Sequence, residues 1–384
     1  MNKIKTLLSI ETLAAVLFFL MLQPVFVWRV NMFFITYLLV FILILNYDIS
    51  RKNNILFFFL LLILSIVPIH GGRNIFGLLS VILFAFIPFV KVNFLNKTYR
   101  VFKLIFVIIT AISLFIWIGL FLGISFPSTV VPPLNDLKTY NYLSYTFLVV
   151  PAHFSSFGRF CCVFDEPGAV GTYSLILLYI SNFDFKRIDN IIILIAGLFS
   201  LSLFFYIALF IFLCCNLFLT SNSFKARFIT ILSIVIFSIS IFNIPILKEA
   251  IGVRIEYDSS TGKLVGDNRS GKELDDYIES IKGTNKFYWG DSDEIIEYFA
   301  GHAGLQTAIL KYGIIFIFLY FIFFLCFAYS KTTKRNLFLF MILLLATLYQ
   351  RPGFVNPGYL FLFTNAVMWG GNNVDSKNLL LTYR

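Results

Sequence analysis

The chain has 384 residues, of which 59% are hydrophobic, 19% aromatic and only 13% charged. An average soluble domain has roughly 45–50% apolar and about 25% charged residues, and a chain of this size cannot bury such an excess of apolar side chains in water. The composition excludes a soluble globular enzyme, a disordered chain and a disulfide-stapled mini-domain. It predicts an all-α polytopic membrane protein.

The formal net charge of +10 is interpreted as anchoring loops on the cytoplasmic side of a membrane and not as a nucleic-acid surface. The five cysteines form no C-x-x-C pair, which argues against a zinc or thioredoxin-type site. The acids of Asp291–Glu294 lack the spacing of a calcium loop. No nucleotide-binding glycine motif is present, so we expect neither a metal nor a nucleotide cofactor.

Apolar runs follow one another along the whole chain. They lie near residues 7–22, 32–46, 55–70, 75–90, 101–124, 168–182, 190–203, 204–220, 227–247, 305–328, 336–349 and 358–371. A spanning helix needs about 20 apolar residues, so several runs are short. The first run lacks a small-residue cleavage site and is expected to be retained as a span.

The stretch 190–220 allows two interpretations. A single helix of about 30 residues would be roughly 45 Å long and strongly tilted in a core of about 30 Å. Two helices meeting at Ser200–Ser202 place the basic clusters, including Lys331–Arg335, on the cytoplasmic side. We therefore predict one integral membrane domain over 1–384, with about twelve spans and both termini in the cytoplasm.

This topology leaves two long segments outside, 125–167 and 248–304. The second is the only sizeable hydrophilic region, and its residues 272–282 are predicted to form a short amphipathic helix.

The sequence Arg159-x5-Asp165-Glu166-Pro167-Gly168 lies where the first outer segment re-enters the membrane. Proline at a first helical position with acids before it is favourable at a helix N-terminus, so Asp165 or Glu166 is expected to cap the next helix. The alternative is that Arg159 and Glu166 face a polar cavity, because charges at a membrane interface tend to be paired and functional.

A second candidate is His302, in a segment that runs from Gly301 to Gly313 and opens the next apolar run. A histidine there is either a general base or cation, given its unperturbed pKa of about 6.5, or an interfacial cap of the helix.

Six arginines fall on the predicted outer side, where the positive-inside rule disfavours them. They are Arg29, Arg73, Arg159, Arg254, Arg269 and Arg351. Arginine binds phosphate in a bidentate manner and stays charged, although a single arginine also snorkels to lipid head groups.

The order of these motifs resembles the O-antigen polymerase (Wzy-type) family, and more broadly the O-antigen ligase and polymerase superfamily. The resemblance covers roughly residues 155–315. It rests on the D-E-P-G segment after Arg159, on Arg269 followed by a short helix and Trp289-Gly290, and on His302-x-x-Leu305-Gln306 before Gly313. Ala303 and Lys311 stand where that family usually has Asn and Glu.

The resemblance implies a membrane-integral glycosyltransferase fold of the GT-C-like class, without metal or nucleotide. The implied activity is polymerisation of undecaprenyl-diphosphate-linked oligosaccharide repeat units at the periplasmic face of a bacterial inner membrane. Membrane lipids, a chain-length regulator and a flippase are the further partners it suggests, with no nucleic acid.

Such chemistry needs cations for the leaving diphosphate and one base for a sugar hydroxyl. We expect Arg159, Arg254 or Arg269 to hold the donor diphosphate, and Arg73 and Arg351 to hold a second one. His302 or Glu166, with Asp165 beside it, would be the base or would orient the hydroxyl.

Three other functions remain open. An O-antigen ligase would share fold and donor but use lipid A core as acceptor. A lipid-linked oligosaccharide flippase or secondary transporter should carry charges deep in several helices, where only Glu11 is a candidate. A membrane scaffold without chemistry is the third.

Overall fold

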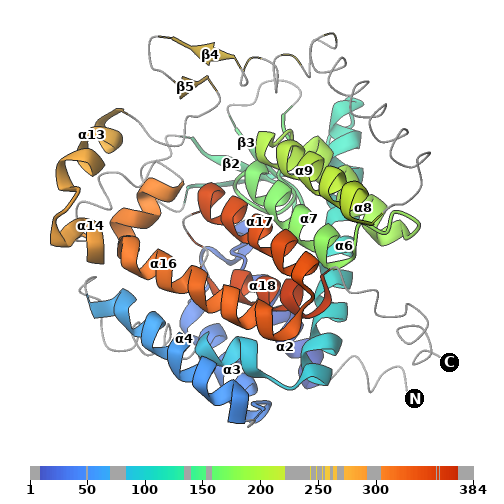
Figure 1. The fold of residues 1–384 in the computed structure, drawn as a ribbon. Helices are drawn as coiled ribbons and strands as arrows, with labels where there is room; N and C mark the ends of the chain where they lie inside the picture. The colour runs from blue at the N-terminus through green and yellow to red at the C-terminus, as the bar shows by residue number, and fades with distance from the viewer. Residues whose placement is uncertain are drawn as a thin grey trace.

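A computed structural model describes residues 9–48, 51–69, 84–133, 140–152, 158–220, 256–259, 263–265, 272–291, 304–351 and 355–370, with single positions at 243, 248, 253 and 353. Its helices surround a central pair, α7 and α18 (Figure 1). The α-helices are α2 (Ile10–Leu20), α3 (Met32–Leu45), α4 (Arg51–Ile69), α6 (Val92–Phe121), α7 (Pro167–Ile180), α8 (Ile188–Phe199), α9 (Leu203–Thr220), α13 (Lys272–Ile281), α14 (Asn285–Trp289), α16 (Leu305–Lys331), α17 (Lys334–Gln350) and α18 (Pro357–Trp369).

The apolar runs of the sequence coincide with these helices, with one exception among the described residues. The run 75–90 is described from Phe84 onward, where it forms a 3-10 helix, η2 (Phe84–Phe89), in place of an α-helix. Pro88 inside it has no amide hydrogen to donate and fixes its own φ, which explains the local departure. The run 227–247 lies outside the described residues apart from Asn243.

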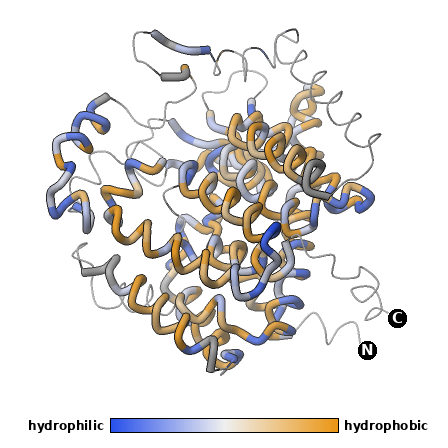
Figure 2. Tube along the Cα trace, viewed as in Figure 1, coloured by the Kyte–Doolittle hydropathy of each residue, from blue (hydrophilic) through white to orange (hydrophobic). Residues whose placement is uncertain are grey.

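Two of the described helices, α6 and α16, are long and apolar enough to cross a membrane. The other apolar helices in the described part of the chain are shorter, including α2, α7 and α8. The fold is therefore mostly helical with two candidate spans. Polar residues concentrate in loops, at helix ends and on α13 and α14, while the remaining helices are predominantly hydrophobic (Figure 2).

Helix ends follow the sequence signals. The Ser9 hydroxyl accepts a hydrogen bond from the amide of Thr12 at the start of α2. At the start of α18, the Oδ1 atom of Asn356 accepts a hydrogen bond from the amide of Gly358, and Pro357 occupies the first helical position. Both are standard ways to satisfy amides that have no partner within the helix.

The stretch 190–220 forms two helices, as predicted. α8 ends at Phe199 and α9 begins at Leu203. Leu201 between them adopts a φ of 48°, and the Ser200 hydroxyl accepts a hydrogen bond from the amide of Ser202. The hydrogen bond between these two serines stabilises a turn that separates the two helices.

The segment 125–167 contains a small sheet that the all-α prediction did not include. Strands β1 (Thr129–Val131), β2 (Tyr142–Ser144) and β3 (Val149–Pro151) pair antiparallel in the order β1-β2-β3. Their valines and threonine favour extended backbone. A second, two-stranded sheet joins β4 (Tyr257–Asp258) and β5 (Lys263–Leu264).

The predicted amphipathic helix at 272–282 is present as α13 and is followed by α14, which packs against a break in α16. The break is at Gly313, whose φ of 79° and ψ of 155° are not helical. The amide of Asp291 donates to the Leu310 carbonyl over 2.7 Å. This bond satisfies a carbonyl that lies close to the break.

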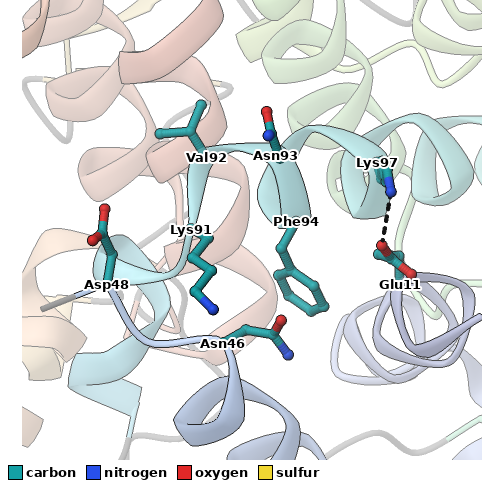
Figure 3. Close-up of a pocket in the computed structure, with 8 residues that line it drawn as sticks. All are labelled: Glu11, Asn46, Asp48, Lys91, Val92, Asn93, Phe94 and Lys97. Atoms are coloured by element: carbon teal, nitrogen blue, oxygen red, sulfur yellow. Dashed lines mark hydrogen bonds and ion pairs between the residues drawn. The ribbon is translucent and has the colours of Figure 1, made fainter. Parts of the chain in front are cut away.

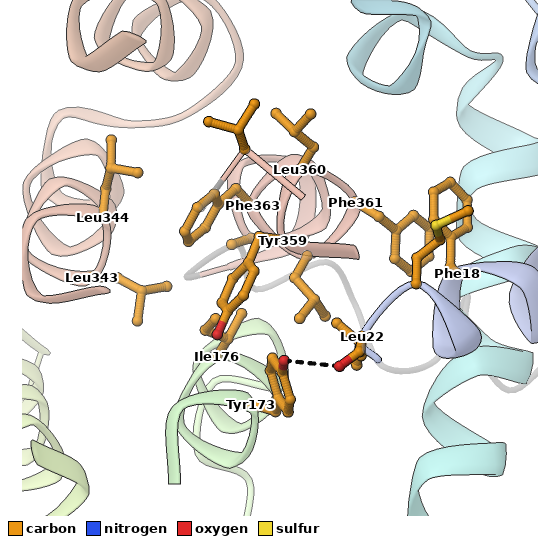
Figure 4. Close-up of a cluster of buried hydrophobic side chains, with 14 of the residues drawn as sticks. Phe18, Leu22, Tyr173, Ile176, Leu343, Leu344, Tyr359, Leu360, Phe361 and Phe363 are labelled. Atoms are coloured by element: carbon orange, nitrogen blue, oxygen red, sulfur yellow. Dashed lines mark hydrogen bonds between the residues drawn. The ribbon is translucent and has the colours of Figure 1, made fainter. Parts of the chain in front are cut away.

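The core is built around α7 and α18, which are buried on almost every side. A helix that is apolar all round belongs in the interior of a helical assembly. Figure 4 shows Tyr359, Phe361 and Phe363 of α18 among residues of the surrounding helices, with Phe18 stacked on Phe361 at a centroid distance of 4.0 Å.

The connecting loops that contact α7 fall into two groups, one at the start of this helix and one at its end. At its start, the Val25 amide donates to the Val163 carbonyl over 2.8 Å, and Arg351 reaches Glu166. At its end, the Tyr179 hydroxyl donates to the Asn336 carbonyl over 3.2 Å. The first group contains segments that the sequence assigns to the outer side, and the second contains segments that it assigns to the cytoplasm.

Candidate functional site

An ion pair between Glu166 and Arg351 is the centre of the candidate site. The Nη1 atom of Arg351 donates to the Oε2 atom of Glu166 over 2.7 Å. Glu166 occupies the N-cap position of α7, with φ −137° and ψ 137°, but its side chain makes no capping hydrogen bond. Glu166 is thus the one of the two expected acids that lies at the N-cap position, but its carboxylate binds Arg351 from the turn after α17 and not an amide of the helix.

The next two residues of the motif start α7 and leave room for the Arg351 guanidinium. Pro167 is the first residue of α7, where the absence of an amide hydrogen costs nothing. Gly168 follows, and a Cβ atom there would lie 2.8 Å from Nη2 of Arg351. The Glu-Pro-Gly sequence therefore supplies a carboxylate, a helix start and room for a guanidinium.

The two partners differ in exposure, since the Arg351 side chain is 15% exposed and that of Glu166 is 38% exposed. The Nε and Nη2 atoms of Arg351 are buried and donate no hydrogen bond within the structure described here. Burial lowers the pKa of Arg351, but the nearby Glu166, Tyr359, Asp165 and Tyr173 outweigh it and leave that pKa raised. Arg351 therefore stays charged and has donors left for an additional anionic oxygen.

Two tyrosines lie in the apolar core next to the pair. Tyr173 of α7 and Tyr359 of α18 have ring centroids 5.4 Å apart. The Tyr173 hydroxyl donates to the Leu22 carbonyl over 3.4 Å (Figure 4). Sequence reasoning missed both residues, although Tyr173 follows Glu166 by seven positions and so returns to the same face of α7.

Arg159 lies at the same end of the bundle. Its Nε atom donates to the Ser200 carbonyl over 3.0 Å, at the turn between α8 and α9. Basic side chains commonly satisfy carbonyls at the end of a helix in this way. Ser202 of this turn touches the start of α7, because a Cβ atom on Gly171 would lie 3.1 Å from its Oγ atom.

The remaining candidates divide into two groups. Asp165 lies next to Glu166 in the chain, and its charge contributes to the raised pKa of Arg351. Four others lie outside the described residues: His302, Arg73, Arg254 and Arg269. The helix predicted to follow His302 begins at Leu305, with Gly304 at its N-cap position.

Within the described ranges, no three His, Cys, Asp or Glu side chains are grouped closely enough to hold a metal ion. The arrangement at Glu166 and Arg351 can bind an anionic oxygen through the guanidinium while a carboxylate lies beside it. Comparisons with protein-family models, with curated proteins and with solved structures give no match to this chain.

Proposed function

We propose that this chain is a membrane-integral glycosyltransferase that polymerises undecaprenyl-diphosphate-linked oligosaccharide repeat units into O-antigen or a similar surface polysaccharide. The observation that carries the proposal is the Glu166–Arg351 pair. It joins the D-E-P-G segment, on which the family resemblance depends, to one of the outer arginines expected to bind diphosphate. The pair combines a cation for a leaving phosphate with a carboxylate for an attacking hydroxyl.

In the proposed reaction, a sugar hydroxyl of the acceptor unit attacks the anomeric carbon of the donor. The new carbon–oxygen bond forms as the bond to the lipid diphosphate breaks, and the configuration at that carbon is inverted. The hydroxyl proton passes to the Glu166 carboxylate or to His302. The charge that develops on the departing diphosphate is stabilised by Arg159, Arg254 or Arg269. We assign Arg351 to this diphosphate as well, and no longer to the second one as expected from the sequence, because it pairs with Glu166. Arg73 helps to hold the second diphosphate.

The proposal includes about twelve spans in the bacterial inner membrane, with both termini in the cytoplasm and residues 248–304 in the periplasm. The sorting of loops to the two ends of α7 supports this sidedness. Reporter fusions within 248–304 test it directly. A cytoplasmic location of that segment would contradict the proposal, because the lipid-linked units and the site would then be on opposite sides of the membrane.

The activity is tested with the purified full-length protein in lipid nanodiscs and synthetic undecaprenyl-diphosphate-linked repeat units. We expect chain growth with release of lipid diphosphate, and loss of both in Glu166→Gln and Arg351→Gln. Lys186→Gln is the control, since Lys186 is an exposed residue of the turn at the other end of α7. Full chain growth in both site variants would refute the assigned roles.

The acceptor is tested separately in a deletion strain of the source bacterium. Loss of a polymerase leaves lipid A core with one repeat unit on a lipopolysaccharide gel, whereas loss of a ligase leaves core alone. If the purified protein neither extends chains nor releases lipid diphosphate, the result would favour a flippase or a scaffold as its function.

A further inference from the structure

We propose that a cavity beside the first turn of α6 binds the zwitterionic headgroup of a phospholipid that carries a primary ammonium and a phosphate. The cavity has a volume of about 440 Å³, within the usual range of roughly 300–1,000 Å³ for ligand pockets. Two lysines, two carboxylates and two asparagines line it, together with Val92 and Phe94. The polar residues are Glu11, Asn46, Asp48, Lys91, Asn93 and Lys97.

One wall is fixed by backbone pairing between the end of α3 and the start of α6. Tyr47 and Val90 form an antiparallel bridge. The Lys91 amide donates to the Asn46 carbonyl, and the Asp48 amide donates to the Phe89 carbonyl, each over 2.9 Å. This isolated bridge holds the backbone of Lys91 beside that of Asp48, so a cation and a carboxylate come from neighbouring segments.

The other wall joins α2 to α6. The Lys97 ammonium lies 3.3 Å from a carboxylate oxygen of Glu11. Glu11, near the start of α2, is thus paired with a lysine of α6. In Figure 3, the ring of Phe94 is seen between this pair and the side chains of Lys91 and Asn46.

The alternation of charge defines the ligand. A simple anion would be attracted by the lysines but repelled by Glu11 and Asp48, and a simple cation would meet the opposite balance. A headgroup with a phosphate and an ammonium a few bonds apart satisfies both signs at once. A primary ammonium also donates hydrogen bonds to carboxylates, which a quaternary ammonium cannot do.

Exposed apolar side chains on the helices that carry the cavity's residues indicate that the cavity adjoins hydrocarbon. Ile10 precedes Glu11, Leu45 precedes Asn46 and Val92 follows Lys91, and all three are exposed. In a membrane-integral chain these exposed apolar surfaces contact the acyl chains of the bilayer, so the charged cavity lies on helices that face lipid. This setting favours the headgroup of an intact membrane lipid over a free soluble zwitterion.

The cavity is distinct from the Glu166–Arg351 site. Further along α6, the Lys103 ammonium donates to the Ser181 hydroxyl over 3.0 Å, just after the end of α7. Glu166 is at the start of α7, so the two sites are associated with opposite ends of that helix. The inference therefore does not depend on the proposed glycosyl transfer.

The experiment measures thermal unfolding of the full-length protein in detergent during titration with phosphatidylethanolamine, phosphatidylglycerol or phosphatidylcholine. We expect phosphatidylethanolamine to give the largest rise in midpoint. Lys91→Gln/Lys97→Gln should weaken its apparent affinity about tenfold or more, the value of one lost charge-assisted hydrogen bond. Glu11→Gln/Asp48→Asn should abolish the preference for phosphatidylethanolamine over phosphatidylglycerol, which has no ammonium.

Lys282→Gln, at an exposed lysine outside the cavity, is the matched control and should behave as the unsubstituted protein. Equal effects of all three lipids, or a preference retained in both double variants, would overturn the proposal. An equal effect of glycerophosphoethanolamine, which lacks acyl chains, would also overturn it. If the double variants do not fold, stepwise N-methylation of the headgroup replaces them: the midpoint rise should decline with each methyl group, and an unchanged rise would refute the role of the carboxylates.

Discussion

The guanidinium of Arg351 and the carboxylate of Glu166 lie 2.7 Å apart, although 185 positions separate them in the chain. The contact ties the turn between α17 and α18 to the start of α7. Because the arginine is more deeply buried than the glutamate, the two residues should not be equivalent when one of them is removed.

Replacing Glu166 should cost more stability than replacing Arg351. Glu166→Gln leaves a buried guanidinium without its charge partner, which we expect to cost about 2 kcal/mol, less than for a fully buried pair because Glu166 is 38% exposed. Arg351→Met leaves a carboxylate that water can reach, at about 1 kcal/mol. SDS titration of the solubilised protein gives both values. A double variant whose loss equals the sum of the single losses would show that the pair contributes no coupling.

Gly168→Ala should separate the pair without unfolding the protein. The added methyl group would lie 2.8 Å from Nη2 of Arg351, the end of a flexible side chain, so the guanidinium must move. In the nanodisc assay we expect about a tenfold fall in chain growth, corresponding to about 1.4 kcal/mol. Gly353→Ala is the control, because a Cβ atom there meets nothing within 4 Å. Equal rates for the two variants would argue against a requirement for the pair.

Gly313→Ala should release α14 from α16. Two features oppose a side chain at Gly313. Its φ is positive, and the backbone of Tyr288 and Trp289 lies close, with the carbonyl carbon of Trp289 2.5 Å from the position of an added Cβ atom. Gly283 has the same φ of 79° but open space around it. Gly283→Ala therefore measures backbone strain alone, about 1 kcal/mol. We expect Gly313→Ala to lose at least twice as much and to expose residues 272–291 to limited proteolysis, a result that equal stabilities would contradict.

Asp189→Asn should destabilise the end of the bundle opposite Glu166. The Lys103 ammonium lies 2.8 Å from the Asp189 carboxylate, and the Lys103 side chain is only 8% exposed. Removing the charge partner of a buried lysine should cost about 3 kcal/mol. Arg187→Gln removes the exposed partner of the same carboxylate, and we expect less than about 1 kcal/mol. Thermal unfolding of the two variants provides the comparison, and equal shifts would show that burial of Lys103 is unimportant.

The helices could be predicted from sequence because each apolar run is local information. The break at Ser200–Ser202 was predictable from the length of the run together with the positive charges, since two helices place the basic clusters on the cytoplasmic side and one tilted helix does not. The sheet of β1 to β3 was not, because strands of three residues are too short to show an alternating pattern.

The candidate site was only half predictable. The sequence identified Glu166 and Arg351 as chemically interesting residues, but spacing does not determine which acid meets which arginine when the contact is tertiary. Lys103 illustrates the same limit, because its position at the start of the run 101–124 does not indicate a partner, whereas the structure buries it against Asp189 and Asn190.

The long interval between Glu166 and Arg351 also affects how the protein is made. At about 5–20 residues per second, the ribosome needs roughly 10–40 s to translate the 185 residues that separate them. Throughout that time the nascent chain carries the Glu166 carboxylate at the start of α7 before its partner Arg351 has been made. This ion pair can therefore form only late in biogenesis, and a chain that stops before α17 lacks the contact between the start of α7 and the turn after α17.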